Sequence, residues 1–158
     1  MSYHIIVNLP ANRDNKGSLK MYDGSGALVF GPVEALGRGT NMASNGYDHT
    51  NWIEENSDTP TGVYAASVID PGTPTSSYGS YQRVAMDPTS GNALLAENNG
   101  RFGIMIHGGD ASKETNASWY PLRPTYGCVR ISNSNQNALI NKIAAVGGSG
   151  KVTVNNIG

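Results

Sequence analysis

Apolar residues recur at every second position in several short segments of this chain, and no other feature limits its accessible folds as strongly. An apolar–polar period of two is typical of a β-strand with one buried face. Clusters of Gly, Asn, Ser and Pro separate these segments and indicate turns. The segments predicted as strands are Tyr3–Leu9, Ser18–Tyr22, Ala27–Phe30, Gly62–Ile69, Tyr81–Met86, Phe102–His107, Cys128–Ser132 and Lys151–Asn155.

Helical periodicity is strong in one segment only. It begins after the capping residue Ser132, continues through Leu139, Ile140, Ile143 and Val146, and ends at Gly147. A second short helix is expected over Thr50–Glu55, whereas 70–77 and 87–91 read as turns. These patterns predict a mainly β, single-domain mixed sheet or sandwich with one C-terminal helix and short helical turns.

Composition and charge exclude several classes of function. The 158 residues, with no break in composition, predict one domain over 1–158. Glycine contributes 20 residues and asparagine 17, which suits a turn-rich β domain. The net charge of −1 leaves no basic surface for nucleic acid, and no apolar run is long enough for membrane insertion.

The chain start, Met1–Asn8, lacks the basic region and apolar length of a signal peptide. Action in the cytoplasm, export by another route and a leader already removed all remain open from this feature.

The single cysteine, Cys128, is the strongest candidate for chemistry. A lone cysteine forms no intramolecular disulfide and supplies no Cys-rich zinc site, and no metal or cofactor is expected. A free thiol is mostly protonated at neutral pH, so a nucleophilic role needs a base. Of His4, His49 and His107, the last is favoured because it ends an apolar segment and two glycines follow it.

The backbone beside the thiol suits an oxyanion. Gly127 allows a substrate carbonyl to approach the main chain, and the N–H groups around Cys128 are suitable donors to a developing negative charge. Each residue alone also has a structural interpretation, since a free cysteine is often buried packing and a strand-end histidine is often only hydrogen-bonded.

The order and spacing of these residues resemble a known family. His107-Gly108 followed by Thr125–Arg130 resembles the signature of L,D-transpeptidase catalytic domains. That signature places a histidine–glycine pair before Ser/Thr-His-Gly-Cys. This chain departs from it at Tyr126, which replaces a histidine, and the segment between His107 and Cys128 is slightly long.

Two upstream segments support the same resemblance. Thr59–Tyr64 is similar to the family's Thr-Pro-x-Gly-x-Tyr/Phe segment, while Leu19–Asp23 with Gly26 and then Leu36-Gly37 resembles its opening strands. The similarity spans about 18–140. It implies the L,D-transpeptidase fold. The period of two that runs into both residues predicts Cys128 at the start of a central strand and His107 at the end of a neighbouring strand.

The resemblance also implies a mechanism and a substrate. His107 removes the proton of Cys128, and the thiolate attacks the bond before the terminal D-Ala of a peptidoglycan tetrapeptide stem. Gly108 orients the imidazole through its carbonyl, and the amides of Gly127 and Cys128 form the oxyanion hole, with Tyr126 offering an N–H or hydroxyl. An amine resolves the thioester by crosslinking or exchange, and water resolves it as a carboxypeptidase.

Three further residues are expected near the substrate. Arg130 lies two positions after Cys128 and so shares its face of a strand, where it holds a substrate carboxylate or braces the site. Trp119 and Tyr120 lie between the two catalytic residues and are expected to wall the donor groove. Loop packing is the alternative for both aromatic residues.

Other functions remain to be weighed against this one. A catalytically silent module that binds wall peptides on the same fold is the main alternative, and Tyr126 permits it. A papain-type protease would have its histidine after the cysteine, and a chymotrypsin-like cysteine protease would have a glycine where Val129 stands. The implied location is the periplasm or cell envelope. An antibacterial effector delivered from another cell is compatible with it, and in that case an immunity protein or a secretion-system carrier is a candidate partner.

Overall fold

A single curved sheet of eight strands forms most of the molecule in a computed structural model, which describes residues 2–40 and 57–157. The strand order in the sheet is β3-β2-β1-β8-β4-β5-β6-β7. The strands are β1 (Ser2–Pro10), β2 (Gly17–Asp23), β3 (Leu28–Ala35), β4 (Gly62–Ile69), β5 (Arg83–Ser90), β6 (Met105–His107), β7 (Val129–Arg130) and β8 (Ser149–Ile157). The helices are α1 (Thr75–Tyr78), α2 (Gly91–Asn98) and α3 (Asn133–Val146).

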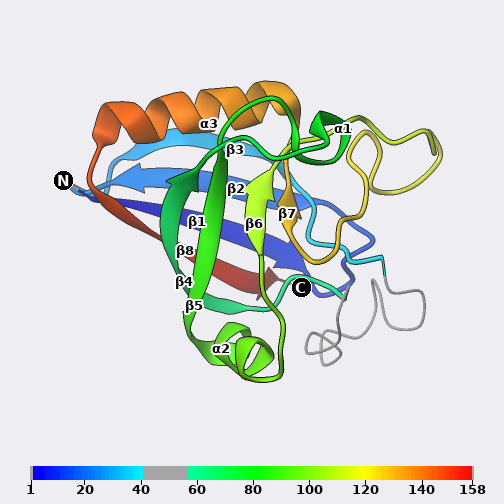
Figure 1. The fold of residues 1–158 in the computed structure, drawn as a ribbon, viewed down its shortest axis with the longest axis horizontal. Coiled ribbons are helices and arrows are strands. Elements are labelled where there is room, and N and C mark those ends of the chain that lie inside the picture. The colour runs from blue at the N-terminus through cyan, green and yellow to red at the C-terminus, as the bar shows by residue number, and fades with distance from the viewer. Residues whose placement is uncertain (1, 41–56, 158) are drawn as a thin grey trace.

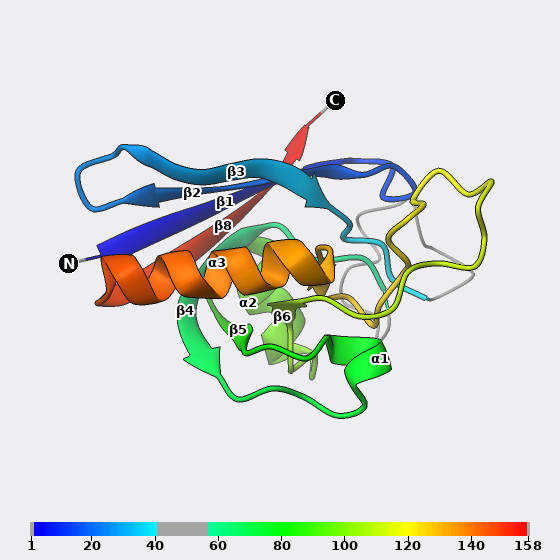
Figure 2. The same ribbon diagram turned by 90° about the horizontal axis from the view of Figure 1, so that it is seen from above.

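The sheet mixes parallel and antiparallel strand pairs and is strongly curved (Figures 1 and 2). The first and last strands, β1 and β8, pair in parallel, and so do β6 and β7; the other neighbouring strands are antiparallel. Leu36, just after β3, forms an antiparallel bridge with Arg130 of β7, with both N–O distances 2.9 Å. This bridge brings the two ends of the sheet together as a near-barrel.

Helix α3 covers the concave side of the curved sheet and contacts β1, β3, β5 and β6 (Figure 2). Its Ser132 cap accepts a hydrogen bond from Asn135 N at 3.2 Å, and Gly147 follows the last turn with φ 73°. Inward residues of β1, β2, β8 and α3 build the core beneath it, each buried aliphatic side chain contributing about 1.5–3 kcal/mol. They include Ile5, Val7, Leu9, Leu19, Met21, Leu139, Ile143, Val152 and Val154.

The predicted mainly β class, the alternating strands and the capped C-terminal helix are confirmed. The expectation of a central strand after Cys128 is wrong, because β7 has only two residues and is last in the sheet order. Helices α1 and α2 occupy segments without a helical period, since each is too short to show one. The helix expected over 50–55 lies outside the described residues.

Within the described residues, no helix combines the length and apolar character needed to cross a membrane.

Candidate active site

Cys128 and His107 line the same cavity, which has a volume of about 620 Å³. Strands β6 and β7 run in parallel, with Ile106 beside Val129 and His107 beside Arg130. Because side chains alternate along a strand, His107, Cys128 and Arg130 all project from one face of this strand pair. The pairing of two very short strands therefore brings the sequence-predicted residues together.

Cys128 is held in a nearly closed environment. Its side chain is 7% exposed, and Sγ donates to Gly103 O at 3.4 Å. Burial raises the pKa of the thiol to about 11, although the Met105 amide and the guanidinium groups of Arg130 and Arg101 act against this shift. The resting residue is therefore a neutral thiol.

His107 is equally enclosed and is oriented by the next residue. Nδ1 lies 2.7 Å from Gly108 O, the geometry expected of an orienting carbonyl. A carbonyl only accepts, so Nδ1 carries the proton and Nε2 is the basic nitrogen. Burial, helped by the positive charge of Arg130 and opposed by the Gly108 carbonyl, lowers the pKa of His107 to about 4. Within the described chain, no hydrogen bond joins the imidazole to Cys128 Sγ, so the resting pair is neutral on both sides.

Tyr78 contacts His107 and was not found by the sequence analysis. The rings of Tyr78 and His107 meet edge to face with their centroids 5.0 Å apart. The Arg83 guanidinium lies over the Tyr78 ring, 5.1 Å from its centroid. Gln136 of α3 holds this segment by donating from Nε2 to the carbonyl of Tyr78 at 3.0 Å. Tyr78 therefore fixes the ring plane of His107 from the α1 side of the cavity.

A braced turn carries Cys128. Gly127 has a φ of 106°, and its amide donates to Thr125 Oγ1 at 3.1 Å. Thr59 Oγ1 donates to Gly127 O at 2.6 Å, and Thr125 Oγ1 donates to Cys128 O at 2.8 Å. Two hydroxyl groups from separate segments thus fix the carbonyls of this turn. Thr59 belongs to one of the upstream motifs, which gives that motif a physical role.

The turn leaves two amides for an oxyanion. The Gly127 amide is already bonded to Thr125, whereas those of Tyr126 and Cys128 have no hydrogen-bond partner in the described parts of the chain. Tyr126 is 71% exposed and lines the cavity, so its hydroxyl is accessible to solvent.

Arg101 is a second residue that the sequence analysis missed. Its guanidinium donates to the carbonyls of Ser57 at 3.2 Å and Asp58 at 2.9 Å, and it lies directly against Gly127. A Cβ at position 127 would overlap Arg101 Nη2 and approach Ser57 O to 2.9 Å. No motif or period marks Arg101, because its neighbours come from distant parts of the sequence.

Trp119 and Tyr120 do not line the Cys128 cavity. Trp119 lines an adjoining cavity of about 810 Å³, where the Arg38 guanidinium lies 4.4 Å from its ring centroid. The two cavities share Thr40, Ser77, Arg123 and Pro124, so they are contiguous. Tyr120 lines neither of these two cavities, and its carbonyl accepts from Lys16 Nζ at 2.7 Å.

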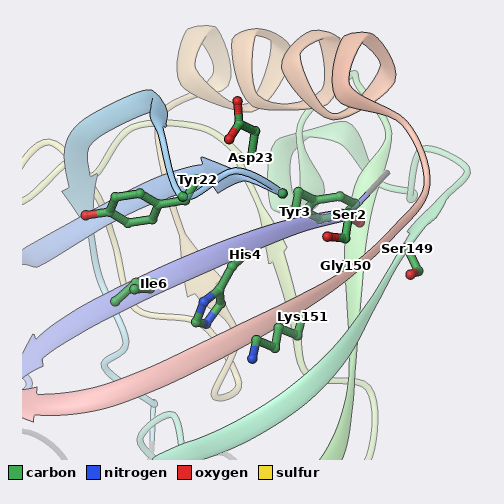
Figure 3. Close-up of a pocket in the computed structure, with 11 residues that line it drawn as sticks. Ser2, Tyr3, His4, Ile6, Tyr22, Asp23, Ser149, Gly150 and Lys151 are labelled. Carbon is green, nitrogen blue, oxygen red and sulfur yellow. The ribbon is translucent and has the colours of Figure 1, made fainter.

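A third hollow, of about 520 Å³, lies at the start of β1 and shares no residue with the Cys128 cavity (Figure 3). His4 and Lys151 project into it from neighbouring strands. His4 Nε2 lies 2.7 Å from Thr153 Oγ1, and burial together with Lys151 lowers its pKa. This histidine is therefore part of the sheet surface and is remote from the thiol.

Fold and site together define a mainly β domain with a buried cysteine–histidine pair at neighbouring strands, a class suited to acyl transfer. The sequence matches the YkuD family, the L,D-transpeptidase catalytic domain, over residues 2–154. The chain therefore belongs to this family. No curated protein matches the sequence.

Solved structures show the same fold. Bd1075 from Bdellovibrio bacteriovorus matches with a TM-score of 0.50 and 17% identity, covering 94% of this chain and 46% of that one. The helical cell shape determining protein Pgp2 from Campylobacter jejuni matches with a TM-score of 0.51 and 21% identity, covering 99% and 49%. A point mutant of Pgp2 matches with a TM-score of 0.53 and 19% identity, covering 99% of this chain and 49% of that one. This chain thus spans about half the length of these proteins.

The neutral resting pair predicts slow alkylation of Cys128 by iodoacetamide near neutral pH. With a pKa near 11 in place of about 8.5, the thiolate fraction at pH 7.5 falls roughly 10²-fold. We expect the rate to keep rising up to about pH 11, and the protein unfolded in guanidinium chloride to react at the rate of a free thiol. A rate that reaches its plateau below pH 7 would instead show a thiolate–imidazolium pair.

Proposed function

We propose that residues 1–158 form one catalytic unit that acts as a cysteine acyltransferase on peptidoglycan tetrapeptide stems. The observation that carries this proposal is the shared cavity of Cys128 and His107, with Nε2 left as the basic nitrogen by the Gly108 carbonyl. A neutral imidazole accepts a proton and a neutral thiol gives one, so proton transfer accompanies attack on the carbonyl before the terminal D-Ala.

The thioester then forms as the C–N bond breaks. His107 returns the proton to the leaving nitrogen, D-Ala departs, and the acyl group remains on Sγ. The side-chain amine of another stem resolves this thioester as a crosslink, a free D-amino acid resolves it as exchange, and water resolves it as a carboxypeptidase. Trp119 contacts the bound stem only where the stem extends into the adjoining cavity.

The amides of Tyr126 and Cys128 supply the oxyanion hole in this proposal. They are the amides beside Sγ that have no partner among residues 2–40 and 57–157, while Gly127 gives the turn its shape. The Gly127 amide contributes only after it leaves Thr125 Oγ1. Donors that are fixed before reaction stabilise the developing charge without further reorganisation.

Replacing Tyr126 tests whether its backbone or its side chain acts. We expect Tyr126→Phe to keep most of the activity, because the exposed hydroxyl is not needed, and Tyr126→Pro to lose roughly 10²–10³-fold in kcat with the amide donor. Thermal melting of both variants controls for folding. A loss above about 10²-fold in Tyr126→Phe would assign the direct role to the hydroxyl.

Incubation with a purified disaccharide-tetrapeptide, followed by mass analysis, tests the function itself. Loss of D-Ala indicates hydrolysis, dimers indicate crosslinking, and incorporation of a labelled D-amino acid indicates exchange. Binding without any product would contradict the proposal and favour a silent peptide-binding module.

A further inference from the structure

Thr59 holds the turn that carries Cys128 from its buried side. Thr59 is 1% exposed, and its Oγ1 donates to Gly127 O at 2.6 Å, with Cys128 O at 3.4 Å. Thr59 is not among the described residues that line the Cys128 cavity. The carbonyl oxygen of Gly127 therefore points into the protein interior and away from the cavity.

The planarity of the peptide bond passes this constraint to the next amide. Gly127 C=O and Cys128 N–H belong to one peptide unit, and in a trans unit the oxygen and the hydrogen point in opposite directions. The cis bonds of the described chain all precede proline, so this unit is trans. Because Thr59 holds the oxygen on the interior side, the N–H of Cys128 is turned toward the cavity. That amide has no hydrogen-bond partner within residues 2–40 and 57–157.

This peptide unit needs a hold from outside the turn. Gly127 has a φ of 106° and no Cβ to restrict rotation, and the bond from its N–H to Thr125 fixes only the preceding peptide unit. Thr59 is itself fixed on both sides. Its N–H donates to Gly37 O at 2.8 Å, and its carbonyl accepts from Nη2 of the buried Arg13 at 3.1 Å. The hydroxyl thus reaches the turn from a well-anchored segment.

We propose that Thr59 is a positioning residue for acyl transfer, because its hydroxyl holds Gly127 O and so keeps the Cys128 amide directed at the oxyanion. This inference rests on the proposed acyl-transfer function and adds a residue that lies outside the cavity. A rotated peptide unit would present the Gly127 carbonyl oxygen to the developing negative charge, and the site would lose a donor. The rate of attack therefore depends on Thr59, whereas binding of the stem does not.

The variants Thr59→Val and Thr59→Ser test this role with the disaccharide-tetrapeptide as donor. Valine keeps the branched shape but has no hydroxyl, so we expect kcat to fall roughly 10²-fold while KM stays within about threefold. Serine keeps the hydroxyl, so Thr59→Ser should retain at least about a third of the original kcat.

Two reactions of Cys128 separate positioning from general damage to the site. p-Nitrophenyl acetate acylates the thiol through an oxyanion and releases nitrophenolate, whereas iodoacetamide alkylates it at a saturated carbon and forms no oxyanion. In Thr59→Val we expect acylation to slow roughly 10²-fold and alkylation by less than about threefold. Thr89→Val is the matched control, because Thr89 Oγ1 donates to Val63 O at 3.0 Å and Thr89 is not among the described lining residues. It should change neither rate.

Equal slowing of both reactions, or a Thr59→Ser variant as slow as Thr59→Val, would overturn the inference and leave Thr59 a structural role only. Should Thr59→Val fail to fold, as judged by thermal melting, Thr59→Ala decides by the same ratio of rates, and an unchanged ratio overturns the inference. If stems are not processed but the ester still acylates Cys128, the proposed function fails while the ratio still tests Thr59. Failure of the ester to acylate the unmodified protein would contradict the oxyanion hole, and this inference with it.

Discussion

Cys128→Ala is expected to abolish turnover of tetrapeptide stems, with a loss of at least about 10⁴-fold in kcat. The variant removes the only thiol among the described residues that line the cavity, and none of the others carries a comparable nucleophile next to His107. The rate under saturating substrate, followed by release of D-Ala, measures this loss.

The fold should survive the same change. Removing one sulfur atom from a 7% exposed position leaves a small void, and the turn is held by the hydroxyl groups of Thr59 and Thr125 through backbone carbonyls. We expect the melting temperature and the affinity for the stem to stay near those of the unmodified protein. Activity within about tenfold of the original would refute the nucleophilic role.

Gly127→Ala should cause the largest loss of stability and also inactivate the site. An alanine there must adopt a φ of 106°, and its Cβ would overlap the Arg101 guanidinium while lying 2.9 Å from Ser57 O. Strain of about 1–3 kcal/mol from the backbone adds to the displacement of a buried, hydrogen-bonded arginine. We expect a decrease of roughly 3–5 kcal/mol in the free energy of unfolding, measured by urea denaturation.

Gly26→Ala provides the matched control. Gly26 also has a positive φ, 85°, but a Cβ at that position meets no atom within 4 Å. The difference between the two variants therefore isolates the contact with Arg101 from the cost of the backbone conformation. Equal destabilisation of both variants would show that Arg101 moves aside freely and does not brace the turn.

Local patterns in the sequence were sufficient for most of the architecture. A period of two along Tyr3–Leu9 and Lys151–Asn155 requires each segment to bury one face, and a Ser132 cap with a Gly147 stop delimits α3. These signals are readable because the side chains that create them are close in the chain. The sequence likewise indicated that Cys128 and His107 belong together, because the motif is recognised from the order and spacing of its residues along the chain.

Tertiary structure alone decided how the site is built and charged. Arg101 lies under Gly127 and Tyr78 lies against His107 because the near-barrel closes around them. The same closure buries Arg130, two of whose nitrogens have no partner among the described residues. The place of β7 at the end of the strand order, with its bridge to Leu36, was likewise visible only in the tertiary structure. Burial and contacts between distant segments set these properties, and neither has a period or spacing that a linear sequence displays.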